Sequence, residues 1–217
     1  MESILNDPEF WSIITLTMRM TLTSTLVSAI LGVPLGLVLH NARFKGKWLV
    51  VNINRTFMAA PPVVIGLVVY LILMRNGPLG FLGLLFSFEA MVIAQTILIT
   101  PIICGSVYAT AQQNATNIQN FAHTMGASRW QTLRLTISEL RQGIYFAIIL
   151  GFGRAVSEVG AIMIVGGNIR HNTRTMTTAI AMLRKQGDFQ RGIYFGVILM
   201  AIAFLLQIIS GIMIKNK

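Results

Sequence analysis

Two full charges stand inside an apolar run of this sequence. The segment GFGRAVSEVGAIMIVGGN, residues 151–168, contains Arg154 and Glu158 among residues that are otherwise apolar or small. Side chains four residues apart lie on one face of a helix, about a turn from each other, and can form an ion pair. If the helix crosses a membrane, pairing is close to obligatory, because an unpaired ionised side chain near the bilayer centre costs roughly 2.5–3.5 kcal/mol on insertion scales.

This charge pair has two interpretations. In the first, it is a structural ion pair that fixes its helix against neighbouring helices or across a dimer interface. The second interpretation is functional, because ionisable side chains within a membrane mark ion pathways. Arg154, with Ser157 beside it, would line such a pathway as a transient counter-charge for an anion. Glu158 would then keep Arg154 from holding the ion too tightly, because a strong site would trap it.

Apolar spans are the elements that must position these charges. Of the 217 residues, 54% are hydrophobic and only 11% are charged, against about 25% charged residues in an ordinary soluble domain. The mean hydropathy of +0.70 therefore predicts an all-α polytopic membrane protein. Five stretches are long enough to cross the hydrocarbon as helices: about 12–40, 48–74, 88–110, 143–166 and 192–214. They leave no room for a separate soluble domain, so residues 1–217 are expected to form a single transmembrane domain.

Prolines and loop charges refine this picture. Pro34, Pro61, Pro62 and Pro101 lie inside or at the ends of the spans, where they are expected to kink helices. With the N-terminus outside, eight Lys and Arg residues fall in the cytoplasm and six outside, which agrees with the retention of basic residues in cytoplasmic loops. The acidic head with Glu2, Asp7 and Glu9 supports this orientation, with the C-terminus in the cytoplasm.

The longest polar segment, residues 112–142, lies between the third and fourth spans. Its apolar residues recur at helical spacing, at Ile118, Phe121, Met125, Leu133 and Ile137. This pattern predicts short amphipathic helices that lie under the membrane and present a face to a partner. The alternative is a helical loop packed on the protein's own spans.

Several kinds of chemistry have no support in the sequence. His40, His123 and His171 are dispersed, without a metal-ligand motif, and Cys104 is the only cysteine. There is no GxSxG elbow and no GxxxxGK[ST] phosphate loop, so the chain cannot hydrolyse ATP by the usual P-loop route. If it carries out active transport, the energy comes from an ion gradient or from a partner. The net charge of +10 is scattered between apolar spans, which argues against a nucleic-acid surface.

The segment NFAHTMGASRWQTLRLTISEL, residues 120–140, resembles the signature of the permease subunits of type I ATP-binding-cassette (ABC) importers. Ala122 and Gly126 are in register with that signature, whereas Asn120 and Phe121 replace its Glu and first Ala. Thr136, Ser138 and Glu139 stand where it has Ile, Leu and Pro, and the missing Pro predicts a helix that continues into the fourth span. Residues 60–73, 76–86 and 157–180 resemble the tungstate branch of the family, which is related to the molybdate permeases.

The resemblance implies a five-helix permease core with a cytoplasmic coupling helix, in a prokaryotic cytoplasmic membrane. It also implies a homodimer joined to two cytoplasmic ABC ATPase subunits, which bind ATP and Mg, and an extracytoplasmic tungstate-binding protein. The chain itself would have no catalytic residue, metal or cofactor. Residues expected to contact the ATPase are Asn120, Phe121, Ala122, Met125, Gly126, Ala127, Ser128, Arg129 and Trp130, with Gly126 at a sharp turn.

The basic loop 167–191 is expected at the outer mouth. Asn168, Arg170 and Arg174 would lie there, and the two arginines would attract an oxyanion or meet acidic residues of the binding protein by long-range steering. The alternative is a solvated connection with no part in capture. For the whole chain, the alternatives to an importer permease are an ion-coupled carrier or channel for a small anion, and a membrane-embedded assembly factor or enzyme.

Overall fold

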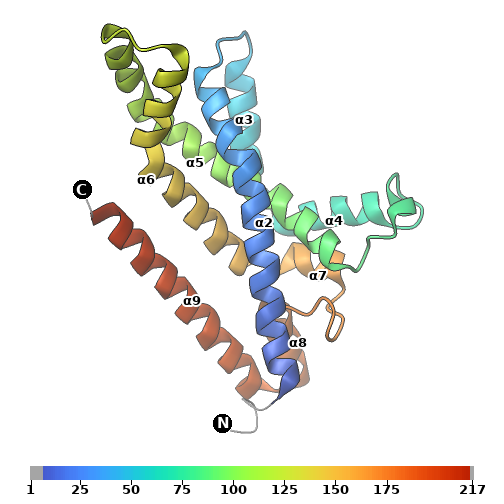
Figure 1. Cartoon of the computed structure of the whole chain (residues 1–217). Coiled ribbons are helices and arrows are strands. Elements are labelled where there is room, and N and C mark those ends of the chain that lie inside the picture. Colours follow the sequence, from blue (N-terminus) through green and yellow to red (C-terminus); the bar gives the residue numbers. More distant parts are fainter. Residues whose placement is uncertain (1–6, 216–217) are drawn as a thin grey trace.

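Four long helices frame the molecule in the computed structural model, which describes residues 7–215 (Figure 1). Each contains an apolar stretch long enough to cross a membrane, and no strand occurs within that range. The prediction of an all-α polytopic membrane protein is therefore confirmed. Of the five expected spans, four correspond to single long helices, and the fifth is present if the bent pair Lys47–Met58 and Pro62–Leu73 counts as one span. The long helices are α2 (Pro8–Asn41), α5 (Phe88–Thr124), α6 (Arg129–Val156) and α9 (Phe189–Lys215). The shorter ones are α3 (Lys47–Met58), α4 (Pro62–Leu73), the 3₁₀ turn η1 (Gly80–Leu82), α7 (Gly160–Gly166) and α8 (Met176–Gln186).

Local sequence signals start several of these helices. Asp7 caps α2 by accepting the Glu9 amide at 2.9 Å, and Pro8 occupies the first turn, where its missing N–H leaves no bond unmade. Ser87 accepts the Ala90 amide at the start of α5. Capping boxes begin α6 at Ser128 and α8 at Thr175, so side chains satisfy amides that have no partner inside the helix.

The second apolar stretch is a broken span. The sequence favours one helix over 48–74, but α3 and α4 meet at a bend of 98° around Pro61 and Pro62. Because proline lacks the amide hydrogen and restricts the residue before it, two consecutive prolines end α3 and start α4 in a new direction. Figure 1 shows α4 running across the direction of α2. Pro34 and Pro101, in contrast, lie within the continuous helices α2 and α5.

The fourth apolar stretch is also divided. Helix α6 ends at Val156, and the separate helix α7 begins at Gly160, so the expected span 143–166 is not one helix. Helix α7 crosses α4 at close range, because a Cβ added at Gly66 would come within 2.6 Å of the Ala161 Cα. The turn between α6 and α7 thus lets the second helices of two divided spans, α4 and α7, pack on each other.

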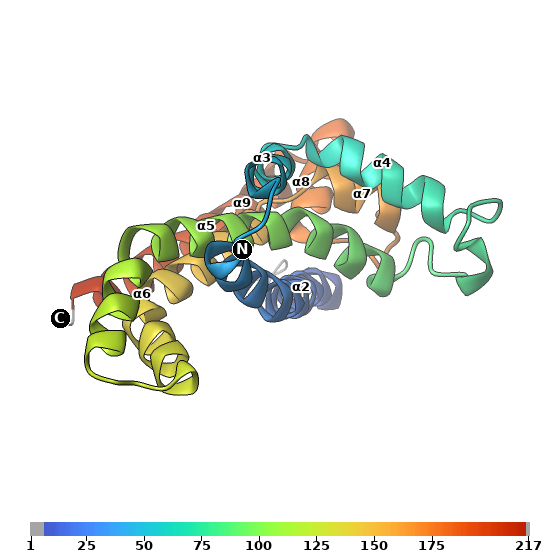
Figure 2. The same ribbon diagram turned by 90° about the horizontal axis from the view of Figure 1, so that it is seen from above.

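The polar segment 112–142 forms a helical hairpin. The expected short helices are in fact the end of α5 and the beginning of α6, joined by a turn at residues 125–128. Viewed from above, this hairpin projects at one side of the molecule (Figure 2). The prediction that the helix continues into the fourth span is confirmed, because α6 is unbroken from Arg129 to Val156. Amide hydrogen bonds thus run from the tip of the hairpin to the turn before α7.

Three apolar clusters hold the helices together. The first joins α4, α5 and α7 around Met91 and Ile162. The second lies between α5 and α6 around Ile103. The third joins the start of α2 to α8 and α9 around Phe10 and Phe195, whose rings stack with centroids 4.9 Å apart. The loop 167–191 is therefore not a simple connection, because α8 within it is buried along Met176, Ala179 and Leu183.

Candidate functional site

Arg154 and Glu158 form the ion pair that their spacing predicts. Arg154 Nη1 lies 2.7 Å from Glu158 Oε2, and the side chains are 34% and 3% exposed, respectively. The two residues do not share a continuous helix, because Glu158 lies in the turn between α6 and α7. Ser157, beside them, is exposed and donates its hydroxyl to the Arg154 carbonyl at 3.0 Å.

Glu158 joins three elements. Its second carboxylate oxygen accepts the Ala161 amide of α7 at 3.0 Å, and its carbonyl accepts the Thr177 hydroxyl of α8 at 2.7 Å. Arg154 holds the same carboxylate from α6. Breaking a buried pair by removing one partner costs about 3–5 kcal/mol, so this geometry favours the structural interpretation of the pair.

A buried polar seam runs between α2 and α5. At its centre Gln95, which is fully buried, donates to the Ala155 carbonyl of α6 at 2.6 Å and accepts from Ser24 of α2 at 3.2 Å. The seam also contains buried hydroxyls that have no hydrogen-bond partner among the described residues. These belong to Thr21, Thr25, Thr96 and Thr100. Sequence reasoning missed Gln95, although a lone amide inside an apolar stretch was a readable signal, because such a group must find partners across helices.

The turn of the α5–α6 hairpin is closed by its own backbone. The Gly126 amide donates to the His123 carbonyl at 3.0 Å, and the Ala127 amide donates to the Ala122 carbonyl at 2.9 Å. This is the Schellman arrangement, in which the residue after the C-cap takes a left-handed conformation. Gly126 has φ +73°, and no atom lies within 4 Å of the position of an added Cβ. Glycine is thus required here by backbone conformation and not by space.

Large apolar side chains are exposed at the hairpin tip. Phe121, Met125 and Trp130 are 59%, 71% and 73% exposed. The structure also brings the other predicted contact residues to this tip. Asn120 and Arg129 are exposed, Ala122 is buried between the arms of the hairpin, and Ser128 caps α6. The arrangement is a rigid two-helix projection with an uncovered apolar end.

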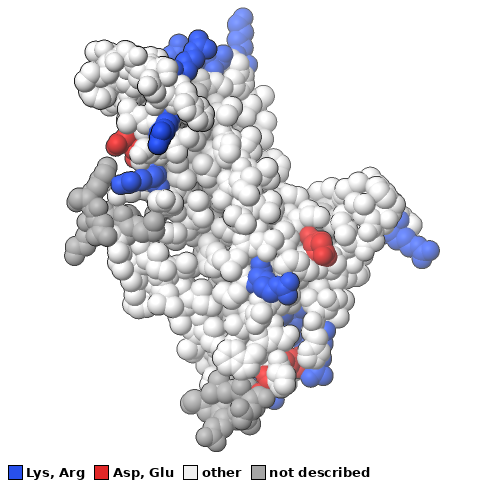
Figure 3. Space-filling view, in the orientation of Figure 1, with Lys and Arg blue, Asp and Glu red and all other residues white. Residues whose placement is uncertain are grey.

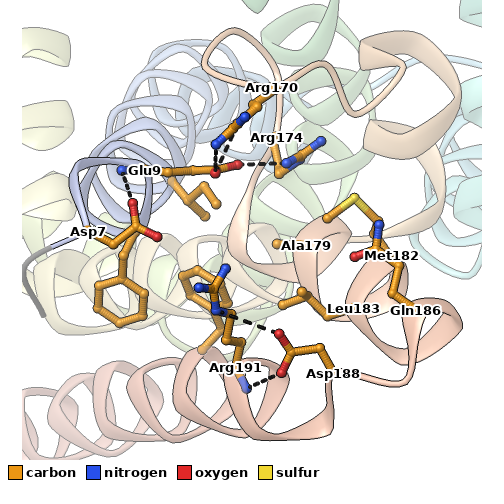
Figure 4. A pocket seen from close by; sticks show the side chains of 13 residues that line it. Asp7, Glu9, Arg170, Arg174, Ala179, Met182, Leu183, Gln186, Asp188 and Arg191 are labelled. Atoms are coloured by element: carbon orange, nitrogen blue, oxygen red, sulfur yellow. Dashed lines mark hydrogen bonds and ion pairs between the residues drawn. The ribbon is translucent and has the colours of Figure 1, made fainter. Parts of the chain in front are cut away.

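The opposite end of the molecule gathers opposite charges around a cavity. Glu9, at the start of α2, accepts Arg170 at 2.6 Å and Arg174 at 2.7 Å through different carboxylate oxygens (Figure 4). Arg170 is mostly exposed and Arg174 mostly buried. The hydrogen bond to the Glu9 carboxylate raises the pKa of the Arg170 guanidinium above its usual value. Asn168 lies outside this cluster, with its carbonyl 3.5 Å from Arg174 Nη2.

These pairings change what the outer arginines can do. From the sequence, we expected Arg170 and Arg174 to be free to attract an oxyanion or a partner. In the structure both bind the carboxylate of Glu9, which is 161 residues before Arg170 in the sequence. A third arginine, Arg191, lies 3.6 Å from Asp188 on the same rim. The cavity measures about 240 Å³, and Phe10, Ile13, Met182, Leu183 and Phe195 are among its apolar lining residues. Its rim is close to electrically neutral.

Arg19 is another arginine within a span, as is Arg55 in α3, and sequence reasoning singled out neither. It lies in α2, exposed, with its guanidinium carbon 5.7 Å from the centroid of the Phe88 ring. An arginine inside the apolar run 12–40 was the same signal that singled out Arg154. On the face shown in Figure 3, charges are sparse across the middle, and several basic residues gather at the upper end, over the loop between α2 and α3. Residues 7–215 contain no cluster of side chains suited to a metal ion.

Comparison with known proteins gives the family. A family model described as "Binding-protein-dependent transport system inner membrane component" matches residues 32–216. The chain belongs to this permease family. The permease is 39% identical over 201 residues to the tungstate uptake system permease protein TupB of Peptoclostridium acidaminophilum, covering 93% of this chain and 88% of that protein.

Two further comparisons place the permease more widely. It is 27% identical over 219 residues to the molybdenum transport system permease protein ModB of Escherichia coli, with 95% and 94% of the two chains covered. Its fold matches a chain of the inward-facing MetNI methionine ABC transporter with a TM-score of 0.75, covering 97% of this permease and 98% of that chain at 17% identity. The predicted resemblance to importer permeases of the tungstate type is confirmed, as is the helical permease fold, in a multi-pass inner-membrane protein.

Proposed function

We propose that this permease is the membrane subunit of an ATP-driven ABC importer that takes up tungstate, with molybdate as a second candidate substrate. The observation that carries the proposal is the 39% identity to a tungstate uptake permease along 93% of the chain. The more distant similarity to a molybdenum permease agrees with a tetrahedral oxyanion as cargo. In this assembly two copies of the chain form the path, and an extracytoplasmic binding protein delivers the ion.

The hairpin tip is the ATPase interface in this proposal. Two cytoplasmic ABC subunits bind ATP and Mg, and each receives one tip, with Phe121, Met125 and Trp130 as anchors. Exposed aromatic side chains of this kind suit a pocket on a partner, where they supply much of the binding free energy. The closed turn at Gly126 and the unbroken helix α6 let the tip move as one body, so ATPase closure can reach the turn at Glu158.

The proposed orientation rests on the role given to the hairpin. The hairpin and the loop between α2 and α3 lie at one end of the molecule, and the start of α2 and α8 lie at the other (Figure 1). With the hairpin in the cytoplasm, the N-terminus is outside and the C-terminus is cytoplasmic. Of the residues that supported this orientation, Glu2 and Lys217 lie outside the described residues.

A bare dianion cannot cross hydrocarbon, because its desolvation cost is prohibitive. The path must therefore supply hydroxyls, amides and balanced positive charge while it keeps binding weak. Glu158 and Arg154 fix the turn beside such a path, and Arg170 and Arg174 lie near its outer mouth.

The substrate is tested on the cognate binding protein, because that protein selects the ion. Calorimetric titration with tungstate, molybdate and sulfate is expected to give the tightest binding for tungstate. Tight binding of sulfate alone would contradict tungstate as the proposed substrate. Purification of the permease from its native membrane is expected to retain an ABC ATPase, and a pure permease without one would contradict the importer assembly.

A further inference from the structure

Three arginines lie within the expected spans, Arg19, Arg55 and Arg154, and Arg19 and Arg154 differ in their partners. Arg154 is neutralised by Glu158, whose two oxygens are both engaged. Arg19 has no ion pair with any carboxylate in the described range 7–215, and its guanidinium lies over the Phe88 ring instead. A cation over an aromatic face at an exposed site is held weakly compared with a buried ion pair. Arg19 therefore keeps its charge and its hydrogen-bond donors available.

The surroundings of Arg19 add two hydroxyls. Thr15 and Thr23 lie one turn before and one turn after it in α2, and all three side chains are exposed. Residues four apart share a helix face, so the three polar groups form a line beside apolar side chains such as Leu22 and Leu26. Arg19 comes ten residues after Glu9, about 15 Å along the helix at 1.5 Å per residue.

Lipid hydrocarbon is an unfavourable environment for these three polar side chains. An unpaired guanidinium within a span faces a bundle interior or a water-filled cavity, where it marks an ion pathway. Its planar fork of donors matches an oxyanion in two parallel hydrogen bonds, and threonine hydroxyls can donate to the remaining oxygens. The chemistry on this face thus fits an oxyanion, and under the proposed function that oxyanion is the tetrahedral cargo.

We propose that Thr15, Arg19 and Thr23 form a transient oxyanion site on the outer half of α2, which the transported ion contacts on its way through. The proposal rests on the proposed function as an oxyanion importer. The stacking of Arg19 on Phe88 positions the guanidinium between ions and is exchanged for the ion when one arrives. A phospholipid phosphate offers the same chemistry, and the experiment separates the two sources.

The test measures oxyanion uptake by the reconstituted complex of permease, ATPase and binding protein. The variants are R19Q, which removes the charge, and R19K, which keeps the charge without the fork. R184Q is the matched control, because Arg184 is an exposed arginine in the last turn of α8 and its loss changes the net charge equally. We expect R19Q to lower the maximal uptake rate about tenfold, as for the loss of one charge-assisted group. R19K should retain more uptake than R19Q, and R184Q should equal the unaltered complex.

The other outcomes are decisive as well. If the R19Q and R184Q complexes take up the oxyanion equally well and the unaltered complex is active, the proposed site is wrong. The proposed function then remains intact. If Arg19 holds a lipid phosphate instead, R19Q will lower the melting temperature and the co-purified phospholipid while uptake per folded complex is unchanged, which also overturns the site. Absence of any oxyanion uptake by the unaltered complex overturns both proposals.

Discussion

The two ends of this permease are built by different kinds of contact. At the hairpin, turn and caps come from residues within six positions of each other, such as Ser128 with Gln131 and Ala127 with Ala122. At the other end, Glu9 holds arginines 161 and 165 residues away, and Glu158 connects α6, α7 and α8. The hairpin is thus locally determined and leaves its apolar tip uncovered, whereas the rest of the molecule is tied together by charges that neutralise one another.

This difference suggests that the two ends respond differently to a binding partner. A projection whose turn and caps are fixed by local hydrogen bonds can dock on a partner without rearranging its tip. A region held by a few long-range ion pairs can change its packing when those pairs are exchanged, since removal of one pair affects several elements. Substitutions at the two ends should therefore fail in different ways.

The largest effect is expected at Arg154. Arg154→Met leaves the Glu158 carboxylate buried without its partner, at a cost of about 3–5 kcal/mol. We expect a large loss of thermal stability and of uptake. The double variant R154M/E158Q should recover much of both, because the side-chain amide oxygen that it places in the turn can still accept the Ala161 amide. Thermal unfolding and uptake measured together check this, and equal losses in the single and double variants would argue against pairing as the main role.

A smaller and more selective effect is expected at the hairpin turn. Gly126→Val forces a β-branched residue into a left-handed conformation and distorts the tip. We expect uptake to fall about tenfold, which corresponds to about 1.4 kcal/mol of coupling, while the ATPase remains bound and still hydrolyses ATP.

Gly187→Val is the matched control for this variant. Gly187 has φ +78° and open space around it, like Gly126, but lies in the turn between α8 and α9. Both variants carry similar backbone strain, about 1–3 kcal/mol. Uptake per ATP hydrolysed should fall only in G126V, and an equal fall in G187V would show that strain alone explains the loss.

Gln95 tests whether the polar seam stabilises the contact between α2, α5 and α6. Gln95→Leu removes the amide that reaches Ala155 and Ser24, leaving buried groups unpaired at about 1–3 kcal/mol. Gln119→Leu removes an exposed 2.8 Å hydrogen bond to Asn41 and should stay within about 0.5 kcal/mol. Melting temperatures in detergent compare the two, and similar values would contradict a stabilising role for the seam.

The smallest effect is expected at the outer charges. Glu9→Gln releases Arg170 and Arg174 and adds one net positive charge near the mouth. At low salt the rate at limiting tungstate should rise about twofold through steering, and the difference should vanish near 1 M salt, where the Debye length is about 3 Å. The double variant R170Q/R174Q should change uptake in the opposite direction. Unchanged uptake and salt dependence in that variant would remove these arginines from capture.

The locally determined end was the more predictable one. The glycine turn at Gly126, the continuation of α6 and the place of Trp130 follow from the resemblance to the permease signature, and the exposed position of Phe121 follows from the helical spacing of apolar residues. The charge spacing likewise predicted the contact between Arg154 and Glu158. The roles of these residues in coupling and transport remain predictions.

The breaks and the outer cluster could not be predicted in the same way. Residues 157–159 contain no proline, and the turn there is fixed by contacts of Glu158 with α7 and α8 that periodicity does not encode. The bend at Pro61 and Pro62 had a visible cause, but its angle depends on the packing of Gly66 against Ala161. Glu9 binds Arg170 and Arg174 from a distant segment of the chain. A count of the charges in the loop could not predict this contact, and it left both arginines without a partner.

Tungstate uptake by proteoliposomes tests the central claim most directly. The complex of permease, ATPase and binding protein is supplied with labelled tungstate outside and ATP on the hairpin side, with and without an uncoupler that dissipates ion gradients. The importer assignment predicts uptake that requires ATP and the binding protein and persists with the uncoupler. Uptake that proceeds without ATP and collapses with the uncoupler would contradict it and identify an ion-coupled carrier instead.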